Sequence, residues 1–212
     1  MSSALRLLAL RRAVTAALLV LVLLPAGAYA LPPDPAGPAK TLEKLRLIPV
    51  SQPLSMAGYD RGDFPHWSRH ANGCTTRKLV LRRDGQNVVH GEKCKRTTGR
   101  WRSFYDGLTT DNAREIDIDH VVPLANAWRS GARDWSLRRR GDFANDLENS
   151  QLIAVSASSN RSKQDSGPDE WVPPRRDAWC LYASWWVQVK REWALTVVRA
   201  EREALVDMIK TC

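Results

Sequence analysis

The sequence predicts an α+β domain in which short strands precede a helical C-terminal segment. Residues 115–120 alternate acidic and β-branched side chains, which is the period of two that a strand shows. A second apolar run, residues 151–155, has the length of a buried strand. Aromatic and apolar residues from Trp179 to Trp193 recur at spacings of three and four, which places them on one helix face.

The first 30 residues are a predicted secretory signal peptide. Arg6, Arg11 and Arg12 precede an apolar run over 13–24, and Ala28 to Ala30 fit the small-x-small pattern of a cleavage site. The apolar run is shorter than the roughly 20 residues that span a bilayer, which disfavours an uncleaved anchor. We therefore expect a secreted protein with no stable membrane association after cleavage.

Residues 31–212 have the length of one domain and a basic composition. Three of the 32 Lys and Arg lie in the signal peptide, which leaves 29 against 23 Asp and Glu. A net charge near +6 attracts polyanions, such as nucleic acid or acidic cell-surface polymers. We expect a monomer.

Four cysteines in an exported chain indicate two disulfides. Of the three possible connectivities, we favour Cys74–Cys94 and Cys180–Cys212. The alternative, a zinc cluster, is disfavoured because the chain contains no CxxC spacing.

The elements before the acidic strand are short. Residues 31–57 read as a Pro-rich linker followed by a short helix over 40–47, and residues 58–212 as the main domain. Within that domain we expect a hairpin, with strands over 78–81 and 87–90 joined by an Asp84–Gly85 turn. A further strand is expected over 100–104.

The remaining elements follow from periodicity and from helix start and stop signals. Ile116 and Ile118 should face the core from the strand over 115–120. A helix should start after Pro123 and end at Gly131, and another should cover 138–147. Ser156 can cap a helix that carries Asn160 and Lys163. The last helices are expected over 179–193 and 200–209.

Polar residues at the ends of the two core strands form a candidate site for phosphodiester hydrolysis. His120 is the candidate general base, because an imidazole titrates near neutral pH. Asp119 and Asn160 offer hard oxygen ligands, which favour Mg²⁺ over zinc, with Mn²⁺ or another divalent ion as alternatives. Asn149 is the candidate that orients the imidazole, and Asn145 competes with it for that role. The candidate phosphate-binding residues are Arg161 and Lys163.

The segments DIDHVVPLANAW and FANDLENSQLIAVSASSNRSKQD resemble the secreted HNH endonucleases related to the GmrSD C-terminal nuclease domain. The resemblance extends over residues 58–212, including Gly73–Cys74 and Tyr105–Asp106–Gly107, and is most specific over 117–163. It implies a ββα-metal (His-Me finger) core with added helices and a C-terminal helical segment. It also implies that His120 is the general base and that Asp119 and Asn160 are metal ligands. Asn149 falls on the middle Asn of the HNH motif, and Asn145 is the alternative for that position.

The chain departs from that family pattern in three respects. The Cys pairs of many HNH sites are absent, about 30 residues separate the two core strands, and the final ligand is Asn rather than His. The protein is expected to be a secreted, metal-dependent endonuclease of low sequence specificity. It should contact the backbone of nucleic acid rather than its bases. The alternatives are a non-catalytic secreted protein that binds nucleic acid or the cell envelope, and a hydrolase of another bond.

Overall fold

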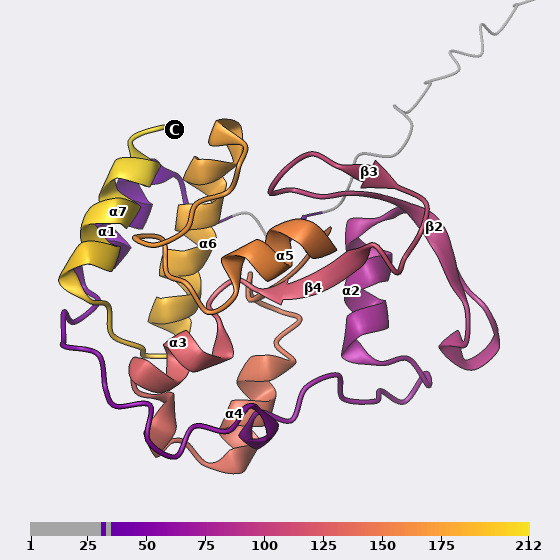
Figure 1. Cartoon of the computed structure of the whole chain (residues 1–212), viewed down its shortest axis with the longest axis horizontal. Helices are drawn as coiled ribbons and strands as arrows, with labels where there is room; N and C mark the ends of the chain where they lie inside the picture. Colours follow the sequence, from indigo (N-terminus) through magenta and orange to yellow (C-terminus); the bar gives the residue numbers. More distant parts are fainter. Residues whose placement is uncertain (1–30, 33–34) are drawn as a thin grey trace, which may run out of the picture.

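The computed structural model describes residues 31–32 and 35–212, and the predicted signal peptide lies outside them. It has the expected α+β architecture (Figure 1). The helices are α1 Pro38–Arg46, α2 Thr76–Asp84, α3 Leu124–Arg129, α4 Leu137–Ala144, α5 Ala157–Lys163, α6 Trp179–Glu192 and α7 Arg199–Ile209. The strands are β1 Gln86–His90, β2 Thr97–Arg102, β3 Thr109–Thr110, β4 Ile116–His120 and β5 Leu152–Ser156. Short 3₁₀ turns are η1 Arg61–Asp63, η2 Glu92–Cys94, η3 Ala132–Asp134 and η4 Arg176–Ala178.

A ββα unit made of β4, β5 and α5 forms the centre of the fold. The two strands pair antiparallel, with Ile116 opposite Ser156 and His120 opposite Leu152. Ile116 and Ile118 are buried, as the alternating pattern predicted. The hydroxyl of Ser156 accepts a hydrogen bond from Ser159 N at 3.1 Å and so caps α5, as expected. The helix therefore starts directly where β5 ends and packs against both strands.

A second, three-stranded sheet has the order β1-β2-β3 and lies beside α2. The strand predicted over 87–90 is confirmed as β1, and β2 contains residues 100–102 of the strand predicted over 100–104, whereas residues 103–104 follow it. The strand predicted over 78–81 is wrong, because these residues lie in α2. Apolar runs this short do not distinguish the two states. The helix is stabilised because Val80 and Leu81 enter an apolar cluster with residues of β4 and β5.

The Asp84–Gly85 pair ends α2 instead of forming a hairpin turn. The buried Asp84 carboxylate accepts a hydrogen bond from Ala154 N of β5 at 2.8 Å, so it anchors the helix to the ββα unit. Gly85 lies so close to the indole of Trp101 that a Cβ atom there would collide with it. These long-range contacts replace the local turn that the dipeptide predicted.

Helix α6 carries the main core. The predicted stripe is buried at Tyr182, Trp186 and Val189 and half-buried at its two ends. Helices α1 and α7 lie side by side against α6 on one side of the molecule (Figure 1). Leu45 of α1 and Ile48, two residues after the helix, are buried in the same core. None of the helices in the described residues is long and apolar enough to cross a membrane.

Both predicted disulfides are present. Cys74–Cys94 joins the segment before α2 to η2, the turn between β1 and β2. Cys180–Cys212 joins α6 to the last residue of the chain. Each bridge closes a loop of modest length and restricts the unfolded chain.

Candidate active site at the ββα unit

His120 is the last residue of β4, and its side chain is buried, with 4% of the residue exposed. Its Nε2 atom lies 3.0 Å from the carbonyl oxygen of Ala144, at the C-terminus of α4. A carbonyl oxygen only accepts hydrogen bonds, so Nε2 carries the proton and Nδ1 carries the free lone pair. Burial lowers the pKa of His120 to about 3, and the Ala144 carbonyl only partly opposes this effect. The imidazole is therefore neutral and oriented at neutral pH.

This low pKa predicts acid sensitivity of the metal-free fold. The folded pKa of about 3 lies below the ordinary value of 6.5, so folding favours the neutral ring. The stabilisation is complete above about pH 6.5 and is lost as the pH falls through the window from 6.5 to 3. Between pH 7 and pH 5, His120 alone should lower the free energy of unfolding by about 2 kcal/mol.

The measurement is urea unfolding in the presence of a chelator at pH 7, 6 and 5. His120→Asn should flatten the slope relative to the wild type, because the titrating group is gone. An unchanged slope in that variant would show that other residues cause the acid sensitivity.

Asp119 is 5% exposed and is held by two side chains. The Lys163 ammonium lies 3.0 Å from Oδ1 and 2.9 Å from Oδ2, and the Tyr105 hydroxyl donates to Oδ2 at 2.6 Å. Burial raises the pKa of Asp119, while Lys163 and Tyr105 oppose that shift. Burial likewise lowers the pKa of Lys163. The carboxylate is therefore fixed in position by a cation and a hydroxyl.

A cavity of about 150 Å³ brings together Asp119, His120 and Asn160, three of the residues that the sequence singled out. Its other lining residues are Arg61, Ile118, Pro123, Leu124, Gln164 and Asp165. Asn160 lies on α5, and its Nδ2 donates to Asp117 Oδ2 at 3.4 Å, which leaves its Oδ1 as an acceptor. A carboxylate and an amide oxygen on one cavity form a donor set that suits a hard cation such as Mg²⁺.

The two candidate orienting residues have different surroundings. Asn149 bonds to Asp146 through both its backbone and its side-chain nitrogen at 2.9 Å, and no described contact links it to His120. Asn145 follows Ala144 directly, and its Nδ2 donates to Pro65 O at 2.7 Å and to Gly141 O at 2.8 Å. Its Oδ1 accepts from Ser68 N and Thr76 Oγ1, both at 2.8 Å. Asn145 therefore fixes the backbone that presents the Ala144 carbonyl.

The two candidate phosphate-binding residues also differ. Arg161 is exposed, with a side-chain exposure of 75%, and its Nε lies 3.6 Å from Asp117 Oδ2. Lys163 was predicted to bind phosphate, but its side chain is 0% exposed and donates to Asp119 and to the carbonyl of His120. Its ammonium therefore braces the end of β4 and does not face the solvent. The i, i+3 spacing from Asn160 turns it toward β4.

Sequence reasoning missed several residues that shape the site. Arg61 lines the cavity from η1, far away in the sequence and without any motif around it. The Trp67 ring lies 5.6 Å from the His120 ring, and the His66 ring lies 6.4 Å from it, measured between centroids. Trp67 has a φ of +62°, an uncommon conformation for a large residue and one that recurs near functional sites. Tyr105 was noted only as part of the family resemblance.

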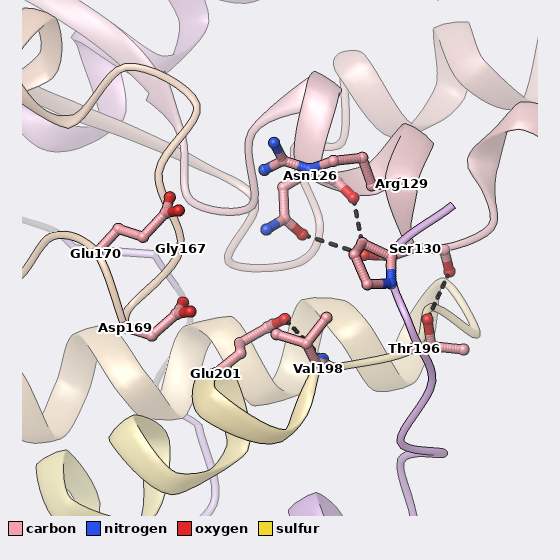
Figure 2. A pocket seen from close by; sticks show the side chains of 10 residues that line it. Asn126, Arg129, Ser130, Gly167, Asp169, Glu170, Thr196, Val198 and Glu201 are labelled. Atoms are coloured by element: carbon pink, nitrogen blue, oxygen red, sulfur yellow. Dashed lines mark hydrogen bonds between the residues drawn. The ribbon is translucent and has the colours of Figure 1, made fainter. Parts of the chain in front are cut away.

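Two other groups of polar residues lie away from this cavity. Ligand atoms of Cys74, His90 and Cys94 lie within 4.8 Å of one another. The two sulfurs form a disulfide, and both His90 ring nitrogens have hydrogen-bond partners, so the oxidised protein offers no metal site there. A pocket of about 180 Å³ is lined by Asp169, Glu170 and Glu201 (Figure 2). The buried Lys190 is paired with Glu201 at 3.2 Å and donates to Asn126 and Ser130, so three of the residues that line this pocket already have an internal partner.

Comparisons with known proteins place the chain in a family. Residues 80–208 match the family model described as GmrSD restriction endonucleases, C-terminal domain. The chain is also 50% identical over 155 residues to an uncharacterized secreted protein of Arthroderma benhamiae (strain ATCC MYA-4681 / CBS 112371), covering 73% of this chain and 76% of that protein. No solved structure matches the chain. The secreted relative and the two disulfides identify a secreted protein. The chain belongs to the family of GmrSD restriction endonuclease C-terminal domains.

Proposed function

We propose that the protein is a secreted, metal-dependent endonuclease that hydrolyses phosphodiester bonds of nucleic acid, with DNA as the expected substrate. One observation carries the proposal. A neutral imidazole with a free Nδ1 shares a small cavity with a braced carboxylate and an amide oxygen. The family match to endonuclease domains supports the same reaction class.

His120 would act as the general base on the attacking water. Its Nδ1 would take the proton, and the Ala144 carbonyl would hold Nε2–H and stabilise the imidazolium that forms. A pKa of about 3 is low for this task. A phosphodiester bound beside the ring would raise the pKa of His120, because a neighbouring negative charge favours the protonated form.

Asp119 and Asn160 would hold the divalent ion, and their oxygen atoms suit Mg²⁺ or Mn²⁺. When bound, the ion would neutralise negative charge that grows on the phosphoryl and leaving oxygens. Lys163 and Tyr105 would keep the Asp119 carboxylate in position. Arg61 at the cavity and the exposed Arg161 would bind phosphate oxygens.

Asn145, rather than Asn149, is our candidate for the residue that orients the base. It would act through the backbone, because its four hydrogen bonds fix the position of the adjacent Ala144 carbonyl. Asn149 would support the same loop through Asp146.

The proposal predicts that residues 31–212, purified without metal, nick supercoiled plasmid when Mg²⁺ or Mn²⁺ is added. Excess chelator should abolish nicking, and renewed Mg²⁺ should restore it, because the ion would neutralise the negative charge that grows on the phosphoryl and leaving oxygens. Undiminished nicking in excess chelator would show that the reaction needs no metal ion. Salt-sensitive DNA binding without cleavage under any divalent ion would instead support a non-catalytic binding protein.

A further inference from the structure

Residues 69–102 carry the whole positive excess of the folded chain. This segment has ten Lys or Arg against two carboxylates, whereas the rest of residues 31–212 has 19 Lys or Arg against 21. The segment forms α2, β1, η2 and β2. These elements lie on one side of the molecule, away from α1 and α7 (Figure 1). The basic character of the protein is therefore local rather than general.

Five exposed cations gather on the β1–β2 hairpin, and we call them the hairpin cluster. Its members are Lys93, Lys95, Arg96, Arg100 and Arg102. Within the described residues, Arg100 pairs with Asp111 at 3.6 Å, and the other four make no ion pair. Lys93, Lys95 and Arg96 therefore remain available to an external anion. Arg102 is partly compensated, because it lies close enough to Asp177 to help lower the pKa of that carboxyl.

Two arginines of the cluster, Arg100 and Arg102, share one face of β2, and Arg96 lies just before the strand. Residues 100 and 102 are exposed, and the intervening Trp101 is buried, as the alternation of a strand requires. At a rise of about 3.3 Å per residue, the backbones of Arg100 and Arg102 are roughly 7 Å apart. One strand of a duplex advances about 3.4 Å along its axis per phosphate, so this interval corresponds to an advance of about two phosphates.

The hairpin cluster is held firmly against the cavity-bearing unit. Arg77 of α2 donates to Ile116 O of β4 at 2.6 Å, and Asp84 is bonded to β5. The Cys74–Cys94 disulfide attaches η2 to the start of α2. Trp67, two residues before the basic segment, packs against His120. A polyanion on the hairpin would therefore be held at a fixed position relative to the cavity.

We propose that the hairpin cluster is a docking surface for the phosphate backbone of nucleic acid, separate from the cleavage cavity. This inference rests on the proposed function and specifies where the substrate is held. A nucleic acid fits better than an acidic polysaccharide, because its phosphates repeat at the spacing of the arginines and its diester is the bond that the cavity is built to cleave. Phosphate contacts of this kind position a substrate without reading its sequence.

Two variants, each with four substitutions and an equal loss of positive charge, test the proposal. The hairpin variant carries Lys93→Gln, Lys95→Gln, Arg96→Gln and Arg102→Gln. The control variant carries Lys40→Gln, Arg46→Gln, Arg191→Gln and Arg199→Gln, exposed residues of α1, α6 and α7. Binding of a fluorescein-labelled 30-base-pair duplex is measured by anisotropy in chelator, from 50 to 200 mM NaCl.

The hairpin variant should bind at least about 10-fold more weakly at 50 mM NaCl. Its slope of log K against log [NaCl] should fall by up to about 3.6, or about 0.9 for each lost phosphate contact. With Mg²⁺, its KM for the duplex should rise while kcat stays unchanged. Hydrolysis of bis(p-nitrophenyl) phosphate, which is too small to reach the hairpin, should equal that of the wild type.

Equal affinities and equal salt slopes for the two variants would overturn the docking surface. Tighter binding of polygalacturonate than of the duplex, dependent on the same residues, would overturn its assignment to nucleic acid. A failure of the proposed function is seen separately, as a wild type that hydrolyses neither the duplex nor the small diester. In that case the binding measurements would still decide whether the hairpin holds DNA.

Discussion

Replacing His120 with alanine should lower kcat for DNA cleavage by about 10²- to 10⁴-fold, the range for loss of a general base. KM should change little, because a buried neutral ring contributes little to holding the substrate. The expected loss follows from the geometry, since Nε2 is committed to Ala144 and Nδ1 alone can take the proton. Cleavage of a labelled duplex under single-turnover conditions measures the chemical step directly.

His66 provides the matched control for this experiment. Its ring lies 6.4 Å from that of His120, and its Nδ1 is 2.8 Å from Phe64 O, which leaves Nε2 free in the same way. His66→Ala should retain most of the kcat. If His66→Ala is inactive and His120→Ala is active, the role of base moves to His66. Partial recovery of His120→Ala by added imidazole would exclude misfolding as the cause of its loss.

The parts of the fold that the sequence predicted best are those with a strong local signal. The acid–isoleucine alternation of β4 and the Ser156 cap of α5 depend on residues close together in the chain, and both are found as expected. The run at 78–81 lacked such a signal. Its three apolar residues fit either state, and only packing of Val80 and Leu81 against distant strands made it a helix.

The candidate site was predicted in part for the same reason. Asp119 and His120 are adjacent in sequence, and Asn160 follows a short strand and a helix cap. Local sequence patterns were therefore enough to predict that all three lie near one another, and they line one cavity. Arg61 reaches that cavity across a long separation in sequence, which no local pattern reveals. The hydrogen bond from His120 goes to a backbone carbonyl, and side-chain identity cannot predict such a partner.

The buried ion pair between Lys163 and Asp119 should affect both the stability and the activity of the protein. Lys163→Met should lower the free energy of unfolding by about 3–5 kcal/mol, because Asp119 would remain buried without its cation. The same change should lower kcat, since the carboxylate would lose one of the two groups that fix it. Urea unfolding in chelator and single-turnover cleavage below the unfolding temperature measure the two effects.

Lys190→Met separates positioning from stability. Lys190 is as buried as Lys163 and is paired with Glu201 at 3.2 Å, away from the cavity. It should show a comparable loss of stability with an unchanged kcat. Equal activity losses in the two variants would reduce Lys163 to a structural ion pair.

The double variant Asp119→Asn/Lys163→Met distinguishes the loss of a buried ion pair from the loss of a metal ligand. Removing both charges avoids an unpaired buried ion, so stability should recover relative to Lys163→Met alone. Activity should not recover, because the proposed site needs the Asp119 carboxylate as an oxygen ligand. Stability would then recover while activity stays low at one pair of residues. A merely structural pair cannot produce that result, whereas a braced metal ligand must.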